Sequence, residues 1–320
     1  MLKQNISLKD HSNYKIGGTA SYFCEVNTKE ELINALKQWK EISADLRDFQ
    51  KSIFVLGSGT NILFSDEGFE GLVIKNSITG IEKAGVEVFV GAGTQLSELV
   101  DFCVENSLSG VEWAGGLPGT VGGAIRGNAG AFEGETKDNV LEVVSLNLNT
   151  LEIIKRGNKN CGFSYRNSIY KLKAKDEIIL SGVFNLSVGK KDEIKSKTNE
   201  KVEYRKQRHP LEYPNIGSIF KNIPIENIPG KFKNELMQFV KKDPFPVVPA
   251  AKIIYLSGLK GKKLGDVMVS EKHTNFIVNL GNGKAKEVKE LVKIIKKEVK
   301  DKYSMDLEEE IMYVGGDLNG

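Results

Sequence analysis

The sequence predicts a protein of mixed helices and strands, of the α+β or α/β class, built from two or three domains. Its 320 residues exceed the usual size of one domain, about 100–200 residues. Apolar residues recur at helical spacing in some segments and at strand spacing in others along the whole chain. The 33 glycines are clustered, and two of the clusters directly follow strand-like runs.

The first elements are marked by a helix start and by two apolar runs. Thr28-Lys-Glu-Glu31 has the form of a capping box, and apolar residues follow it at helical spacing as far as Trp39, which predicts a helix. The runs Ile53–Leu56 and Val86–Val90 predict strands, because each stops abruptly at glycine. A short helix with one apolar face is expected over Leu96–Cys103.

Further strands and a boundary are predicted in the middle of the chain. Leu141–Leu148 alternates between apolar and polar residues, and Ile178–Leu186 is also typical of a strand. The polar segment Lys190–Gln207 is interpreted as a helix or a linker, and as a domain boundary.

Near the C-terminus, strands are predicted over Asn275–Leu280 and around Glu310–Val314. Between them, Lys284–Lys302 carries many lysines, which could suggest a nucleic-acid-binding patch. Its apolar residues nevertheless recur at helical spacing, so a solvated amphipathic helix is the better interpretation. The net charge of +3, from 45 basic and 42 acidic residues, also argues against nucleic-acid binding.

The cysteine pattern and the first residues bear on the compartment. Cys24, Cys103 and Cys161 lie far apart without a CxxC pair, which argues against a zinc site or a disulfide framework. No apolar leader and no stretch of membrane-spanning length is visible. We therefore expect a cytoplasmic protein with no bound metal and no membrane association.

Two glycine-rich loops are candidates for binding phosphate groups. They are Gly57-Ser-Gly-Thr-Asn61 and Leu117-Pro-Gly-Thr-Val-Gly-Gly-Ala124, the latter followed by Gly127-Asn-Ala-Gly130. Glycine allows successive backbone N–H groups to point at one anion, and Ser58, Thr60 and Thr120 add hydroxyl donors. Neither loop matches the Rossmann GxGxxG or the P-loop pattern. One such loop alone would be interpreted as a tight turn, whereas two in one chain indicate a dinucleotide site.

The loops and several further motifs resemble one known family. Both glycine loops and Asn128-Ala-Gly-Ala131 are similar to the FAD loops of the UDP-N-acetylenolpyruvoylglucosamine reductases (MurB), in their compact subclass. Further stretches match in the family's order: His11-Ser-Asn-Tyr-Lys-Ile-Gly-Gly18, Phe163-Ser-Tyr-Arg-Asn-Ser168, Gly217-Ser-Ile-Phe-Lys-Asn222, Gly258-Leu-Lys-Gly261 and Val269-Ser-Glu-Lys-His-Thr-Asn-Phe-Ile-Val-Asn279. Each motif is weak alone, but the ordered set is specific.

The resemblance implies an α+β fold with a two-part FAD-binding domain of the vanillyl-alcohol-oxidase (PCMH) type and a C-terminal α/β substrate domain. The expected division is residues 1–75 with 311–320, then 76–203, and finally the substrate domain at 204–310. The implied reaction is the NADPH-dependent, FAD-mediated reduction of UDP-N-acetylenolpyruvoylglucosamine to UDP-N-acetylmuramate, a peptidoglycan precursor. We expect a monomer whose partners are the UDP-sugar and NADPH.

The resemblance also assigns the catalytic residues. Ser218 matches the proton donor, although without the resemblance a serine in Gly-Ser would be interpreted as part of a plain turn. Arg166 would stabilise the substrate carboxylate through its planar guanidinium, and an ion pair is its alternative role. Glu310 aligns with the third catalytic residue and could hydrogen-bond the developing enolate if it is protonated. Of the neighbouring glutamates in Leu307-Glu-Glu-Glu-Ile311, two are expected to be plain surface charges.

The remaining site residues follow from the same motifs. Tyr165, Lys221 and Asn222 match substrate-contacting positions, although an exposed lysine is also common. The expected FAD-contacting residues are Gly57, Ser58, Gly59, Thr60, Asn61, Pro118, Gly119, Thr120, Gly122, Gly123, Asn128 and Gly130. The chain departs from the family pattern at Tyr255, where an acidic residue is usual, at Gly127, where a larger residue is common, and at Thr60, which replaces serine.

Two other functions remain open on the sequence. Another FAD oxidoreductase of the same fold, acting on an alcohol or a sugar, would explain the glycine loops but not the contexts of Ser218 and Glu310. A catalytically inactive protein that binds a nucleotide sugar would explain the motifs without the chemistry. Fold analogy alone does not separate these alternatives.

Overall fold

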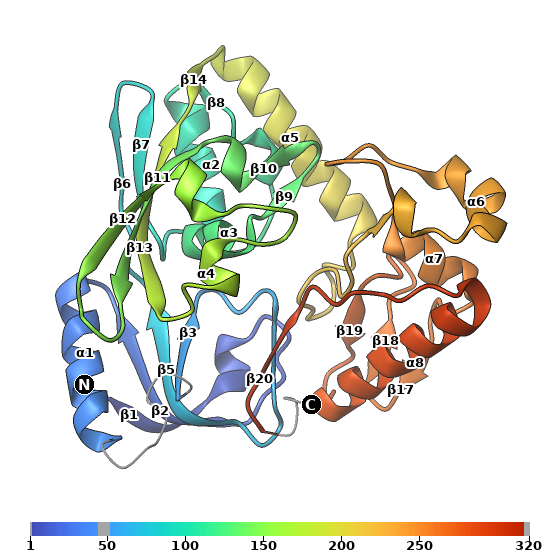
Figure 1. The fold of residues 1–320 in the computed structure, drawn as a ribbon, viewed down its shortest axis with the longest axis horizontal. Coiled ribbons are helices and arrows are strands. Elements are labelled where there is room, and N and C mark those ends of the chain that lie inside the picture. The colour runs from blue at the N-terminus through green and yellow to red at the C-terminus, as the bar shows by residue number, and fades with distance from the viewer. Residues whose placement is uncertain (1, 44–51, 317–320) are drawn as a thin grey trace. The chain divides into compact units, whose positions relative to one another are not determined.

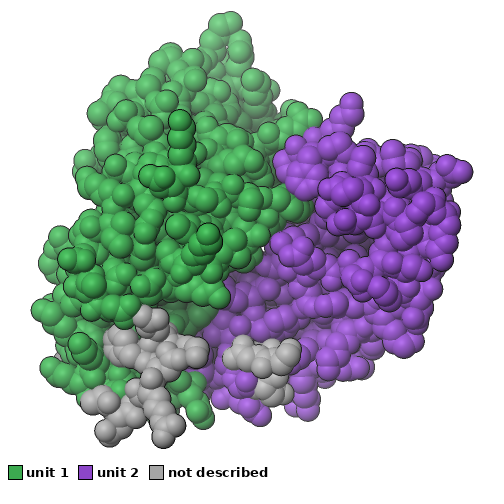
Figure 2. All heavy atoms as spheres, in the orientation of Figure 1, with its two compact units in different colours: residues 1–6, 20–58, 70–205 green, residues 7–19, 59–69, 206–320 purple. Residues whose placement is uncertain are grey.

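The computed structural model describes residues 2–43 and 52–316, and the chain forms two compact units (Figure 2). Unit 1 comprises residues 1–6, 20–58 and 70–205, and unit 2 comprises residues 7–19, 59–69 and 206–320. The predicted domain limits at residues 75, 203 and 310 divide the chain differently, and they stay a prediction.

Unit 1 contains two larger sheets. The four-stranded sheet has the order β1-β2-β5-β3, and the five-stranded antiparallel sheet has the order β12-β11-β13-β7-β6 (Figure 1). Their strands are β1 (Lys3–Ser7), β2 (Thr19–Val26), β3 (Ile53–Leu56), β5 (Phe69–Asn76), β6 (Ile81–Ala84), β7 (Glu87–Gly91), β11 (Val140–Asn147), β12 (Ile153–Gly157) and β13 (Glu177–Asn185). Short two-stranded pairs add β8 (Leu108–Ser109) with β14 (Ser187–Val188), and β9 (Gly130–Ala131) with β10 (Gly134–Glu135).

Helix α1 (Lys29–Ile42) confirms the first predicted helix and covers the four-stranded sheet (Figure 1). The Thr28 side chain accepts a hydrogen bond from Glu31 N at 3.1 Å, as a capping box requires. The Glu31 carboxylate, however, accepts from Asn27 N at 2.7 Å, so the box closes one residue earlier than predicted. Buried Trp39 packs on Tyr22, with ring centroids 5.1 Å apart.

The remaining helices of unit 1 build a second core on the five-stranded sheet. Helix α2 (Leu96–Glu105) buries its predicted apolar face, and α3 (Val121–Gly127) packs on β13, where Ile125 occupies the space beside Gly182. Helix α4 (Ile169–Leu172) is short. The segment interpreted as a helix or a linker is α5 (Lys191–Arg208), and the change from unit 1 to unit 2 falls within it.

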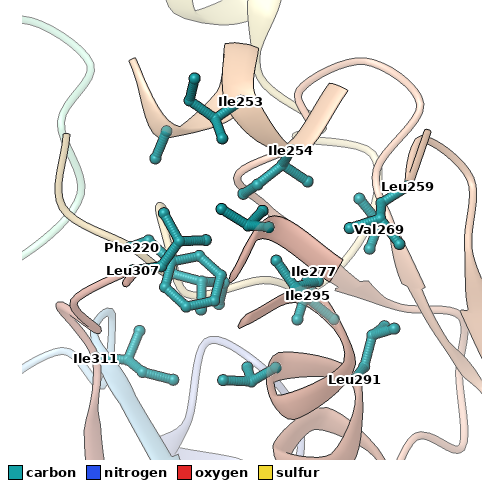
Figure 3. Close-up of a cluster of buried hydrophobic side chains, with 14 of the residues drawn as sticks. Phe220, Ile253, Ile254, Leu259, Val269, Ile277, Leu291, Ile295, Leu307 and Ile311 are labelled. Carbon is teal, nitrogen blue, oxygen red and sulfur yellow. The ribbon is translucent and has the colours of Figure 1, made fainter. Parts of the chain in front are cut away.

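Unit 2 is built around a small sheet and helix α8 (Ala285–Tyr303). The sheet has the order β17-β18-β19, and its strands are β17 (Lys263–Leu264), β18 (Val267–Val269) and β19 (Ile277–Asn279). Further elements are β15 (Ile223–Pro224), α6 (Gly230–Leu236), β16 (Val247–Val248) and α7 (Ala250–Leu256). The predicted stripe of α8 is buried, with Val288, Leu291 and Ile295 fully inaccessible (Figure 3 shows the last two). The helix is therefore amphipathic, as its periodicity indicated.

The C-terminal strand of unit 2 pairs with a segment from the N-terminal part of the chain. Strand β20 (Met312–Val314) lies parallel to β4 (Ile62–Phe64), with Tyr313 opposite Leu63. Between β4 and β5, the Asp66 carboxylate accepts from the first two amides of α8, at 2.9 and 3.2 Å. An acidic side chain at a helix N-terminus is stabilising because it complements the helix dipole. These contacts hold residues 59–69 in unit 2.

Candidate functional site

The two predicted glycine loops meet within unit 1. A Cβ atom on Gly57 would lie only 2.6 Å from Thr120 Oγ1, so glycine is required for the close approach. Ser58 Oγ donates to Gln95 Oε1 at 2.9 Å, and Gln95 forms an isolated antiparallel bridge with Thr120. Gly57, Ser58 and Thr120 are thus brought together, whereas nothing in the sequence marked Gln95.

The remainder of the first loop belongs to unit 2. Gly59 has φ +66°, and its carbonyl accepts from Asn13 N at 3.1 Å. A Cβ atom there would lie 2.3 Å from His11 O, which connects this loop to the predicted N-terminal motif. After Thr60, the Asn61 side chain donates to Glu310 O at 3.0 Å. The loop therefore holds the backbone of a predicted catalytic residue.

The second glycine loop uses several of its own amides within the protein. Pro118 and Gly119 lead into Thr120, which caps α3. The donors and acceptors are Val121 N to Thr94 O at 2.9 Å, Gly122 N to Ala92 O at 2.8 Å, and Gly123 N to Thr120 Oγ1 at 3.3 Å. The expectation that successive amides point at one anion is wrong for these three, because the start of α3 packs on residues 92–94.

Asn128 connects the glycine-rich segment to the arginine motif. It is completely buried at the end of α3, with φ +43°. Its side chain donates to Ser164 O at 2.9 Å and accepts from Lys137 N at 3.0 Å. These hydrogen bonds are structural, and a contact of Asn128 with a cofactor stays a prediction.

Arg166 is held by several groups of unit 1. Its Nη2 donates to Gly130 O at 2.8 Å, and its Nη1 lies 4.0 Å from an oxygen of buried Glu135. The guanidinium carbon lies 5.0 Å from the centroid of the Tyr165 ring. Arg166 also has φ +56°, an uncommon conformation for a residue with a side chain. A guanidinium fixed in this way is oriented before any ligand arrives.

In unit 2, the segment that carries Ser218 pairs with the segment that carries Glu310. Glu310 N donates to Ile219 O at 2.8 Å, and Lys221 N donates to Glu308 O at 2.9 Å. These two bonds flank an antiparallel bridge between Phe220 and Glu309. The structure therefore pairs the three residues that follow the predicted proton donor with the segment of the predicted carboxylate in one short ladder. It also explains why β20 begins only at Met312, since Glu310 N bonds Ile219 and not β4.

The three glutamates of this ladder have different surroundings. Glu308 is exposed and forms an ion pair with Lys221, which is itself buried. Glu309 accepts from Lys296 Nζ at 2.6 Å and from the Tyr313 hydroxyl. Its side chain is only 21% exposed, so the expectation of two plain surface charges is wrong for Glu309. Burial, together with the hydrogen bond to Glu309, raises the pKa of Tyr313.

The last predicted substrate residue, Asn222, directly precedes β15. Its side-chain oxygen accepts a hydrogen bond from Ala250 N, at the start of α7, at 3.2 Å. Lys221 and Asn222 are therefore positioned by contacts with two different segments, Lys221 with Glu308 and Asn222 with Ala250. Tyr255, which departs from the family pattern, is 51% exposed on α7.

Two classes of feature are absent from the described residues. Across residues 2–43 and 52–316, no group of three or more His, Cys, Asp or Glu side chains could hold a metal ion. In the same ranges, no helix combines the length and apolar character needed to cross a membrane.

The fold and the converging glycine loops define a flavin-binding oxidoreductase. Residues 20–150 match the family model of an FAD binding domain, and residues 209–314 match that of the UDP-N-acetylenolpyruvoylglucosamine reductase C-terminal domain. The predicted fold class is thereby confirmed. The chain belongs to the UDP-N-acetylenolpyruvoylglucosamine reductase family.

Its similarity to relatives covers almost the whole chain. It is 38% identical to the reductase of Caldanaerobacter subterraneus subsp. tengcongensis, over 97% of this chain and 93% of the relative. The reductase of Clostridium novyi is 35% identical over 98% of this chain and 92% of the relative. The crystal structure of the MurB reductase from Thermus caldophilus matches with a TM-score of 0.75 and 29% identity, over 98% of this chain and the whole of that chain.

Proposed function

We propose that this protein catalyses the NADPH-dependent, FAD-mediated reduction of UDP-N-acetylenolpyruvoylglucosamine to UDP-N-acetylmuramate. The observation that carries the proposal is the ladder of Ile219–Lys221 with Glu308–Glu310. The residue that follows Ser218 thereby pairs with Glu310, in the domain that matches the reductase family. An oxidase that acts on an alcohol has no need of a proton donor, because it removes a hydride from its substrate.

The residues present fit the FAD that the family implies. Gly57 and Thr120 meet so closely that a side chain at residue 57 would fill the space, and Ser58 supplies a hydroxyl group next to them. The amides of residues 121–123, at the start of α3, already donate to groups of the protein. We therefore assign the donors to the FAD diphosphate to Gly57–Asn61 and to residues 118–120. When bound, FAD supplies the hydride that adds to the substrate alkene.

Ser218 provides the proton that completes the reduction. The hydride adds to the terminal carbon of the enolpyruvyl group, so negative charge develops toward the substrate carboxylate. Arg166 stabilises this charge because its guanidinium is permanently protonated and already oriented. We assign Glu310 to the stabilisation of the same enolate, and Ser218 Oγ gives its proton to the carbon next to the carboxylate.

Lys221 and Asn222 bind the remainder of the UDP-sugar. The Lys221 ammonium is paired with exposed Glu308, so we expect it to exchange this partner for an anionic group of the substrate. Tyr165 packs on Arg166 and restricts the orientation of the guanidinium. We expect the protein to act as a monomer on these small molecules.

The test follows the flavin colour during one anaerobic turnover. NADPH bleaches the flavin, and the enolpyruvyl UDP-sugar restores its colour. We expect Ser218→Ala to bleach normally and to recolour about a hundredfold or more slowly, as expected for the loss of a general acid. Ser257→Ala, at the end of α7, is the matched control and should recolour like the wild type.

Two results would contradict the proposal. Reduced protein that ignores the substrate but reoxidises readily in oxygen would indicate an oxidase of the same fold. A preparation that binds the UDP-sugar but is never bleached by NADPH would indicate an inactive binding protein. Recolouring of Ser218→Ala at the wild-type rate would refute only the role of Ser218.

A further inference from the structure

Asn275 binds the backbone of the segment that carries Ser218. This residue precedes β19 in unit 2 and is 3% exposed. Its side-chain oxygen accepts from Phe220 N at 3.0 Å, and its side-chain nitrogen donates to Phe220 O at 2.8 Å. The carbonyl of Asn275 also accepts from Ile219 N at 2.8 Å. One buried residue therefore makes three hydrogen bonds to the two residues before Lys221.

The side chain of Asn275 takes the place of a neighbouring strand. In the ladder with Glu308–Glu310, the groups that bond across are Ile219 O and Lys221 N, so the N–H and carbonyl of Phe220 face the other way. The Asn275 amide satisfies both of these groups at once, as a paired strand would. Residues 219–221 are consequently bonded on both edges, with the Phe220 ring in the core of unit 2 (Figure 3).

The chain on the other side of Ser218 reaches it through a glycine. Gly217 has φ +84°, and no atom lies within 4 Å of the position that a Cβ on it would take. Its amide donates to the Asn215 side chain at 3.1 Å. On that side, Gly217 separates Ser218 from buried Ile216, whereas the bonded Ile219 and Phe220 follow Ser218 directly.

We propose that Asn275 is a positioning residue for the proton transfer, which fixes Ser218 relative to Glu310 through the backbone of Phe220. The inference rests on the proposed role of Ser218. Removal of the amide frees the N–H and the carbonyl of Phe220, while the bond from Ile219 N to Asn275 O and the ladder with Glu310 remain. Ser218 then samples positions that are wrong for the transfer, and a misplacement of about 1 Å can slow a reaction about a hundredfold.

Asn279 provides the matched control. It is equally buried, at 1% exposure, and lies at the end of β19. Its side chain makes three hydrogen bonds, to Tyr14 O and to the amides of Gly281 and Gly283. Asn275→Ala removes two buried side-chain bonds and Asn279→Ala removes three, and only the first removes bonds to the segment of Ser218.

The experiment compares both half-reactions in the flavin-loaded variants. In Asn275→Ala we expect bleaching by NADPH within about twofold of the wild type, and recolouring by the enolpyruvyl UDP-sugar slowed about ten- to a hundredfold. Asn279→Ala should lower the unfolding temperature at least as much but recolour at the wild-type rate. Amide hydrogen exchange is the independent readout: the amides of residues 219–221 should lose protection in Asn275→Ala only.

A second variant covers the possibility that Asn275→Ala does not fold. Asn275→Asp fills the same volume and loses only the donor to Phe220 O, and it too should recolour at least about tenfold more slowly. Recolouring at the wild-type rate, or equal slowing of both half-reactions, overturns the proposal, as does equal slowing of recolouring in Asn279→Ala. Ser218→Ala, measured in parallel, separates the two ideas: if it recolours normally, the proposed function of Ser218 has failed, and not the contact made by Asn275.

Discussion

Replacement of Gly57 by alanine should disturb the place where the two glycine loops meet. The added Cβ would lie 2.6 Å from Thr120 Oγ1, and the next nearest atoms, Cγ2 and Cβ of Thr120, lie at 3.5 and 3.6 Å. Gly57 does not have a positive φ, so its backbone accepts alanine without strain. The expected destabilisation is therefore purely steric, and it comes from the clash of the new Cβ with Thr120 Oγ1.

The magnitude follows from that geometry. An extra methyl group in a well-packed region costs roughly 1–3 kcal/mol. Part of the lost stability should be recovered if the clashing atoms are removed. Thr120→Ala leaves only the Cβ of residue 120, at 3.6 Å, which is an ordinary van der Waals contact. Thr120→Ala alone loses the cap of α3, which costs about 0.5–2 kcal/mol. The two changes should couple favourably, so that the double variant loses less than the sum of the single losses.

The assay measures flavin retention and the free energy of unfolding together. We expect Gly57→Ala to bind FAD more weakly and to unfold at lower denaturant concentration, and the double variant to recover part of both losses. Gly127→Ala is the control, since a Cβ at residue 127 would meet no atom within 4 Å. Alanine is also the better helix former by about 1 kcal/mol, so this variant should be neutral or slightly more stable.

The reasoning is refuted if Gly57→Ala retains FAD and unfolds like the wild type. It is also refuted if Gly127→Ala is as damaging, or if the effects of Gly57→Ala and Thr120→Ala are simply additive. Additive losses would mean that the two loops do not touch in the folded protein.

Three further predictions concern stability. Asp66→Ala should cost about 1–2 kcal/mol in urea unfolding, because two amides of α8 lose an acceptor; Asp66→Asn, which keeps one acceptor oxygen, should cost less, and equal losses would contradict the role of the acceptor oxygen. Burial lowers the pKa of His273 from 6.5 to about 4, so between these values the unfolded chain binds more protons and acidification removes up to about 3 kcal/mol of stability. His273→Phe should lose this acid-dependent part of the urea unfolding profile, and an unchanged profile would assign it to other groups. Arg205→Ala should cost about 2–4 kcal/mol, because this buried guanidinium binds the carbonyls of Gly115 and Trp113; a loss below about 1 kcal/mol in chemical denaturation would contradict it.

Elements whose signal is local could be predicted from the sequence. Helical spacing of apolar residues predicted the buried stripe of α8 and the apolar face of α2. The capping residue Thr28 predicted the start of α1. The ordered family motifs identified the residues of the Ser218 and Glu310 segments. The pairing of these segments could not be derived from periodicity, because it joins distant parts of the chain by only two backbone hydrogen bonds.

The residues that contact the predicted site residues could not be recognised from any pattern in the sequence. Glu135 approaches Arg166, and Glu309 is bound by Tyr313 and Lys296, although each glutamate is typical of an exposed residue in the sequence. Asn275 falls inside a run that predicts a strand, yet β19 begins only at Ile277. Its amide satisfies the backbone of another segment, so its role depends on tertiary structure alone.

The most direct test of the proposed reaction is the mass of the product formed in heavy water under anaerobic conditions. With NADPH and the enolpyruvyl UDP-sugar, we predict UDP-N-acetylmuramate that carries deuterium at the carbon next to the carboxylate, where the solvent-exchanged proton of Ser218 is delivered. Recovery of the unreduced substrate, or a reduced product without deuterium at that carbon, would contradict the account.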